Sequence, residues 1–120
     1  MLFHTPLVAA TAATCAARTN LYVASYSGNV TSLSLTNARL DFSSTTNFCG
    51  PSPSWLTWDS FNRLLYCTDE GLNQPEGSVS SFKAAVDGGL AGLGRQTTIP
   101  GPVSAVKFGS SFYRGLAVAH

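Results

Sequence analysis

The chain has 120 residues, of which 44% are hydrophobic and only 11% are charged, and its formal net charge is +1. A charge this small leaves no electrostatic footprint for nucleic acid or for an anionic membrane surface, so we expect neither as a partner. The hydrophobic fraction is ordinary for a folded chain and does not indicate disorder. Ser and Thr are abundant while Glu, Lys and Gln are scarce, which together with 11 Gly and 6 Pro favours an all-β fold.

The N-terminal segment differs from the rest of the chain. Residues 7–17 are apolar and Ala-rich, carry no charge, and end in small residues at Cys15 and Ala17. This pattern is typical of a secretory signal peptide, which predicts a leader over residues 1–17 and a mature domain over residues 18–120. Residues 1–4 contain no Lys or Arg, so a short leader of a cytoplasmic protein remains the alternative to secretion. The apolar run is too short to span a bilayer.

A strand pattern repeats along the remaining sequence. Apolar runs begin at Leu21, Leu65 and Leu116, and their spacings are 44 (65 − 21) and 51 (116 − 65) positions. A period of roughly 40 to 50 residues built from short strands is the signature of a β-propeller blade. Because each blade buries its faces only against its neighbours, about two such units predict part of a larger propeller, with the remaining blades missing from these residues.

The middle unit has the pattern of one complete blade of four strands. We expect its strands over residues 54–58, 64–68, 77–83 and 93–99, with a turn at 59–63, a loop at 69–76 and a hairpin turn at 87–89. The preceding unit predicts strands over residues 21–25, 29–35 and about 40–46. The following unit predicts strands over residues 103–108 and 116–120.

Two cysteines, Cys49 and Cys67, stay in the mature domain, where a secreted chain can pair them. Cys49 precedes the Gly50-Pro51 turn, and Cys67 lies in the middle of an expected strand. Pairing requires their Cα atoms to lie within disulfide range, which depends on the fold. Two buried free thiols are the favoured expectation, and a disulfide is the alternative.

Several segments of the chain together resemble one family of propellers. The segments, in order, are Pro51-Ser52-Pro53-Ser54-Trp55-Leu56, Asn62-Arg63-Leu64-Leu65-Tyr66, Asp69-Glu70, Gly77-Ser78-Val79-Ser80-Ser81-Phe82, Asp87-Gly88-Gly89-Leu90 and Gly101-Pro102-Val103. This ordered set is similar to the lactonase family of seven-bladed propellers, which contains 6-phosphogluconolactonases and carboxy-cis,cis-muconate cyclases. The resemblance covers about residues 19–120 and implies an N-terminal fragment of such a propeller.

Glu70 is the one candidate catalytic residue. It follows an expected strand, at the point where propeller loops converge on the central channel, and a carboxylate there can act as a general base. It also matches the acid of the family's Asn-Glu pair, although Asp69 replaces the Asn. A solvated loop acid is the alternative reading. Ser104 stands where the family commonly has a His that is proposed to line the active-site cleft, which weakens the implied activity.

Other polar residues give no site. The two His residues lie far apart, with no cluster of Cys, His and carboxylates at ligand spacing, so we expect no metal. The family resemblance implies that no organic cofactor is needed either. Lys107 is expected at a solvated surface, although first strands line the channel. Four aromatic residues are expected to pack between blades: Trp55, Trp58, Tyr66 and Phe82.

Two functions follow from these residues. The resemblance implies an enzyme that hydrolyses or forms a lactone ring on a carboxylated small molecule or a muconate-like substrate. The alternative is a non-catalytic, secreted propeller that serves as a binding or scaffold module, which Ser104 favours. Fold alone does not decide between them.

Overall fold

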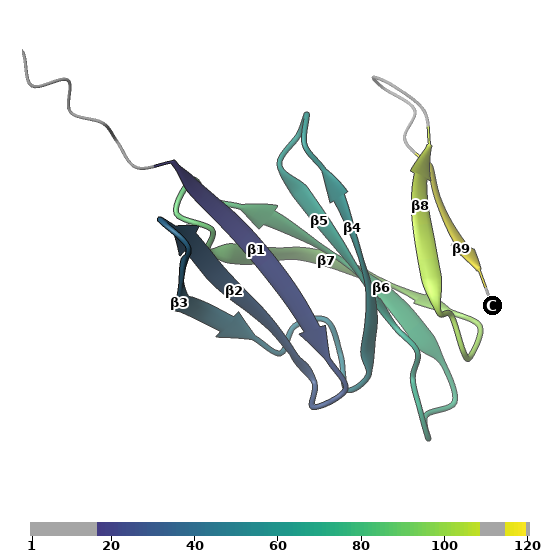
Figure 1. The fold of residues 1–120 in the computed structure, drawn as a ribbon. Coiled ribbons are helices and arrows are strands. Elements are labelled where there is room, and N and C mark those ends of the chain that lie inside the picture. Colours follow the sequence, from purple (N-terminus) through teal and green to yellow (C-terminus); the bar gives the residue numbers. More distant parts are fainter. Residues whose placement is uncertain (1–16, 109–114, 120) are drawn as a thin grey trace, which may run out of the picture.

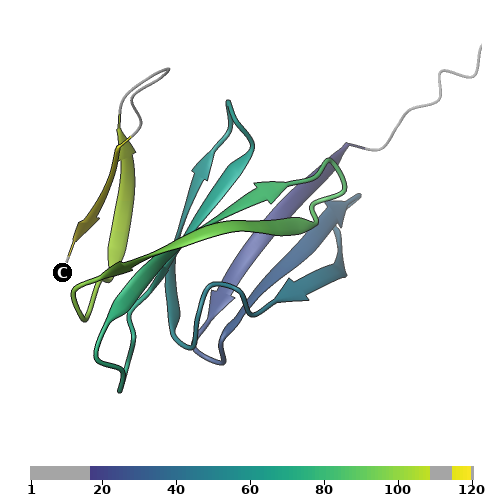
Figure 2. The same ribbon diagram turned by 180° about the vertical axis from the view of Figure 1, so that it is seen from behind.

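The computed structural model describes residues 17–108 and 115–119, and the regular elements of this part are all β-strands. The strands form three antiparallel sheets that follow one another along the chain (Figures 1 and 2). The sheets hold three, four and two strands, which confirms the prediction of an all-β chain built from propeller blades. The prediction of a signal peptide concerns residues 1–17, of which 1–16 lie outside the described residues.

The first sheet consists of β1 (Arg18–Ser25), β2 (Asn29–Thr36) and β3 (Arg39–Thr46), in that order. Between β2 and β3 only two residues turn the chain, Asn37 and Ala38, with φ of 50° and 60°. Positive φ at both central residues belongs to the hairpin turn whose twist matches that of the flanking strands. The three strands expected here are confirmed, each slightly longer than the sequence indicated.

The middle sheet is a four-stranded meander of β4 (Pro53–Asp59), β5 (Leu64–Asp69), β6 (Gly77–Ala84) and β7 (Leu90–Thr98). The expected strand at residues 93–99 begins earlier, at Leu90, which pairs with Ala84 directly after the hairpin turn. Gly92 lies in this early part of β7, opposite Phe82, and a Cβ at this position would lie 2.7 Å from Cδ1 of Phe48. The glycine therefore lets the aromatic ring lie against the strand.

The third sheet pairs β8 (Ser104–Phe108) with β9 (Gly115–Ala119). Figures 1 and 2 show it on the opposite side of the middle sheet from β1–β3. The two strands expected here are confirmed, except that His120 lies outside the described residues.

The apolar core lies between the first and middle sheets. Its buried members are Val30, Cys49, Leu65, Cys67 and Phe82. Cys49 and Cys67 form a disulfide, with their Cα atoms 5.8 Å apart. The favoured expectation of two free thiols is therefore wrong: the segment between β3 and β4 folds back over β5 and brings Cys49 onto the strand that carries Cys67.

Because neighbouring strands are antiparallel, the connections between them alternate between the two ends of the sheets. One end holds residues 26–28, 47–52, 70–76 and 99–103, and we call it the Glu70 end. Hydrogen bonds tie these segments together, including Glu70 N to Ser52 O and Gly101 N to Glu70 O. The opposite end holds the turns between β2 and β3, β4 and β5, and β6 and β7.

Candidate functional site

Glu70 lies directly after β5, and its main chain is fixed from two sides. Its N–H donates to the Ser52 carbonyl at 3.0 Å, and its own carbonyl accepts from Gly101 N–H at 3.1 Å. Ser52 belongs to the segment that enters β4, and Gly101 belongs to the segment that enters β8. The sequence predicted that Glu70 lies where propeller loops converge. In the structure, the segments that enter β4 and β8 both bond to its backbone.

The side chain of Glu70 has a partner that the sequence reading did not name. The Tyr26 hydroxyl donates to Glu70 Oε1 at 2.8 Å, across the gap between the first and middle sheets. Tyr26 is 61% exposed, so the pair is open to solvent. The hydrogen bond to Glu70 raises the pKa of Tyr26 above its usual 10, with smaller contributions from desolvation and from the nearby negative charge. Tyr26 therefore stays protonated, as a donor, at neutral pH.

A simple signal could have found Tyr26. It lies 44 positions before Glu70 (70 − 26), which is the spacing between Leu21 and Leu65. Both residues are therefore the first residue after the corresponding strand of successive repeats, β1 and β5. Equivalent positions in neighbouring blades lie at the same end, which is why the two side chains meet.

Asp69, the neighbour of Glu70, is buried and organises the Glu70 end. Its Oδ1 accepts from the main-chain N–H of Ser52 at 2.9 Å and of Gly71 at 3.0 Å. Its Oδ2 accepts from the Ser78 hydroxyl at 3.4 Å. Gly50 makes room for this carboxylate, since a Cβ there would lie 2.2 Å from Oδ2. Asp69 thus supports the backbone on both sides of Glu70 rather than facing solvent.

Charge is distributed unevenly between the two ends of the sheets. The four segments of the Glu70 end contain Glu70 and Glu76 but no Lys or Arg. Arg95 reaches this end from β7, but its guanidinium donates to the Phe48 carbonyl and to Ser80 Oγ, and it lies 5.5 Å from the centre of the Phe48 ring. The described part of the Glu70 end therefore offers carboxylates and a phenol, with its one nearby cation already engaged.

Ser104 begins β8 and is half-buried, directly after the segment 99–103 of the Glu70 end. A serine hydroxyl does not titrate near neutral pH, so it cannot replace the acid–base capacity of a histidine. Among the described residues of the Glu70 end, Glu70 is the candidate for proton transfer. It is a titratable side chain, it is accessible to solvent, and it has a hydrogen-bonded partner in Tyr26.

Lys107 is not a solvated surface cation, contrary to the expectation. Its Nζ lies 3.0 Å from Oδ1 of Asp59, whose side chain is 1% exposed. Burial opposes ionisation of Asp59, but hydrogen bonds from Asn62 and Lys107 outweigh it and hold the pKa of Asp59 at about 2. This ion pair connects β4 to β8 at the opposite end from Glu70, so we assign it a structural role.

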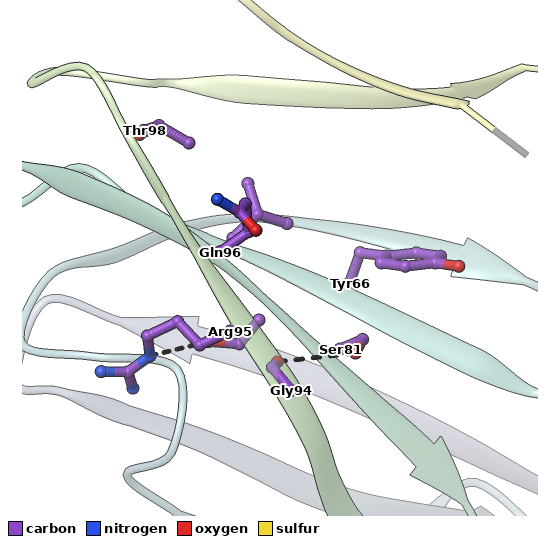
Figure 3. A pocket seen from close by; sticks show the side chains of 8 residues that line it. Tyr66, Ser81, Gly94, Arg95, Gln96 and Thr98 are labelled. Carbon is purple, nitrogen blue, oxygen red and sulfur yellow. Dashed lines mark hydrogen bonds between the residues drawn. The ribbon is translucent and has the colours of Figure 1, made fainter.

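A hollow of about 470 Å³ lies on one face of β5, β6 and β7, the face turned toward the third sheet (Figure 3). Its residues include Tyr66, Ser81, Gln96 and Thr98. Among its described lining residues Arg95 is the one charged side chain, and it bonds Ser80 Oγ at 3.2 Å. The hollow offers no acid–base group comparable to Glu70, and its position fits the packing face of a blade.

The aromatic residues expected to pack between blades do so at three positions. Phe82 is fully buried in the core. Trp58 stacks at 5.9 Å on Tyr22 of β1, and Trp55 Nε1 donates to the Ala105 carbonyl of β8 at 3.0 Å. Tyr66 instead lines the hollow described above.

Residues 17–108 and 115–119 contain no group of three or more His, Cys, Asp or Glu side chains that could hold a metal ion. The same part of the chain contains no helix long and apolar enough to cross a membrane.

The sheets, their order and the repeat define the class of protein: part of a β-propeller built from antiparallel four-stranded blades. Comparison with protein families makes the assignment more specific. Residues 20–120 match the family described as lactonase, 7-bladed beta-propeller, and the chain belongs to this family. The match supports a lactonase-type function. No curated protein and no solved structure gave a significant match.

Proposed function

We propose that the complete propeller is a lactonase-type enzyme that acts on a carboxylated small-molecule lactone, with Glu70 as an acid–base residue. The observation that carries the proposal is the placement of Glu70. Its backbone is fixed by segments entering two sheets, and its carboxylate is held by Tyr26 while remaining accessible. The reaction is hydrolysis of the lactone, as in 6-phosphogluconolactonases, or lactone formation on a muconate-like substrate.

In the hydrolytic direction, Glu70 acts as a general base. It takes a proton from a water molecule, whose oxygen attacks the lactone carbonyl carbon and forms the new C–O bond. The ring C–O bond then breaks, and the departing alkoxide receives the proton from the protonated Glu70. The products are a carboxylate and an alcohol after loss of the acid proton to water. Such a positioned group typically contributes roughly 10²- to 10⁴-fold to the rate.

The charge distribution suggests how the substrate is oriented. A substrate carboxylate is normally recognised by Arg or Lys, and the segments of the Glu70 end contain neither. We therefore place the uncharged lactone ring against the Tyr26–Glu70 pair. The substrate carboxylate then points toward basic groups supplied by other blades.

Secretion belongs to the same proposal. The Cys49–Cys67 disulfide supports it, because such bonds persist in oxidising compartments and are rare in the cytosol of ordinary cells. We expect processing near Ala17, so mass spectrometry of the natural protein should find an N-terminus at or near Arg18. Recovery of intact Met1 from the cell interior would contradict secretion.

A non-catalytic binding module is the second candidate. Ser104, at the position where the family commonly has a His, is the observation that favours it. A propeller that had lost its acid–base groups would bind its ligand without turning it over.

The decisive experiment substitutes Glu70→Gln in the complete propeller. We expect turnover in assays of lactone hydrolysis and muconate lactonisation to fall by roughly 10²-fold or more. Glu76→Gln is the matched control: it lies in the same segment, is exposed, and has no described partner. A surface change of this kind usually alters stability by within about 0.5 kcal/mol. Unchanged turnover in Glu70→Gln would remove Glu70 from the site.

A further inference from the structure

We infer that Tyr26 is a positioning residue of the site, which fixes the orientation of the Glu70 carboxylate from the neighbouring blade. This inference rests on the proposed role of Glu70 and adds a second residue to it. The starting observation is the 2.8 Å hydrogen bond from the Tyr26 hydroxyl to Glu70 Oε1.

The turn that carries Tyr26 is itself well defined. Gly28 N–H donates to the Ser25 carbonyl at 3.0 Å, which closes a four-residue turn with Tyr26 in its second position. The Ser25 hydroxyl also accepts from Ser27 N–H at 3.2 Å. A Cβ on Gly28 would lie 3.7 Å from the Gly50 carbonyl, so the turn packs on segment 47–52 of the Glu70 end. Tyr26 is therefore presented from a fixed backbone.

Glu70 needs this contact because its backbone bonds leave its side-chain torsions undetermined. Ser52 and Gly101 fix the peptide groups on either side of its Cα. A half-buried glutamate at a strand end keeps rotamer freedom, which costs free energy to restrict at the moment of reaction. Tyr26 holds Oε1, and within the described residues Oε2 has no hydrogen-bond partner, so one oxygen is anchored and the other is available for proton transfer.

The arrangement also determines which oxygen reacts. A phenol that donates to Oε1 weakens that oxygen as a proton acceptor, since one of its two lone pairs is already engaged. The raised pKa of Tyr26, which arises first from this hydrogen bond, keeps the donor in place through neutral and mildly alkaline pH. The two blades thus contribute different residues to one site. The middle sheet supplies the base, Glu70, and the first sheet supplies Tyr26, which orients its carboxylate.

The test compares Tyr26→Phe, Glu70→Gln and the double variant in the complete propeller. Tyr26→Phe should lower kcat roughly 2- to 10-fold, the range for loss of one hydrogen bond, and leave KM within about twofold. The double variant should be no slower than Glu70→Gln alone, because Tyr26 acts through Glu70. Tyr66→Phe is the matched control, since it makes the same chemical change in the hollow, whose lining includes neither Tyr26 nor Glu70.

The outcomes separate the two proposals. Loss of activity in Glu70→Gln with unchanged kcat in Tyr26→Phe would overturn the positioning role and leave Glu70 in the site. An added loss in the double variant would show that Tyr26 acts independently of Glu70, which also overturns it. Full activity in Glu70→Gln would overturn both proposals.

A spectroscopic measurement checks the pair without an activity assay. In a titration of tyrosine absorbance, the tyrosine that is missing from Tyr26→Phe should ionise above pH 10, and in Glu70→Gln it should ionise closer to 10. Identical titration of this tyrosine in the native protein and in Glu70→Gln would show that no Tyr26–Glu70 bond exists in solution and would overturn the inference.

Discussion

The middle sheet contacts its two neighbours through different sets of interactions. Toward the first sheet it presents an apolar face, with Phe82 and Leu65 buried and a disulfide reaching from β5 to the segment that enters β4. Toward the third sheet it makes directional polar contacts: Trp55 and Thr57 donate to one carbonyl of Ala105, and Asp59 pairs with Lys107. Similar blades are therefore joined by different interactions along one chain.

The difference has a physical consequence for stability and for geometry. Apolar burial stabilises in proportion to area and without strict direction. Hydrogen bonds and a buried ion pair contribute little net free energy but require defined atomic positions. We expect the first contact to supply most of the stability, and the second to set the register between β4 and β8.

The largest effect is expected for Phe82→Ala, in the apolar contact. Phe82 is fully buried and packs edge-on against Phe48 with ring centres 5.5 Å apart. Removing a buried phenyl ring from a core typically costs about 3 to 5 kcal/mol. Chemical denaturation should show a loss of this size, and Phe61→Ala is the control, because Phe61 is 86% exposed. Equal effects of the two substitutions would mean that the contact between the first and middle sheets is not the main stabilising one.

A smaller loss is expected when the disulfide is removed. Cys49 and Cys67 close a loop with a sequence separation of 18. A loop of this size predicts about 3 kcal/mol of stabilisation in the chain-entropy account. We expect the variant with both Cys49→Ser and Cys67→Ser to unfold at a lower denaturant concentration than the native protein. A reducing agent should lower the unfolding midpoint of the native protein but not that of the variant. A native protein insensitive to reductant under conditions that cleave the bond would contradict this contribution.

Much of the fold could be predicted from the sequence, because strand patterns and turns are local. The 44-residue spacing and the Gly-containing turns placed every described strand, although β7 begins at Leu90, three residues before the expected start at residue 93. The disulfide depended on how the segment between β3 and β4 folds back, which no local pattern encodes.

The candidate site was predictable only in part, for the same reason. Strand-end position and family resemblance singled out Glu70. The bonds from Ser52 and Gly101 to its backbone come from segments 18 and 31 positions away (70 − 52 and 101 − 70). Lys107 was expected at a solvated surface because its partner, Asp59, belongs to another blade. Tyr26 alone could have been predicted from the repeat, since it occupies the same position after β1 that Glu70 occupies after β5.

The smallest of the three effects concerns the polar contact and its dependence on pH. Asp59 has a pKa of about 2 in the folded protein, below the 3.8 of a free carboxyl. Because the folded-state pKa is the lower one, the ionised pair stabilises the protein above pH 3.8, and this stabilisation is lost as the pH falls toward 2. The shift corresponds to roughly 1 to 2 kcal/mol, because solvent reaches the partly exposed Lys107 and screens the pair.

The measurement is the free energy of unfolding at several pH values between 2 and 6, for the native protein and for Asp59→Asn. The native protein should lose stability over the acid part of this range more steeply than Asp59→Asn, which cannot titrate at this position. Lys107→Met should raise the pH at which the loss occurs, because the carboxylate then keeps Asn62 but lacks its cation. Parallel pH profiles for all three proteins would show that the Asp59–Lys107 pair does not contribute to the contact between β4 and β8. The contact would then depend on the Trp55 and Thr57 hydrogen bonds to Ala105.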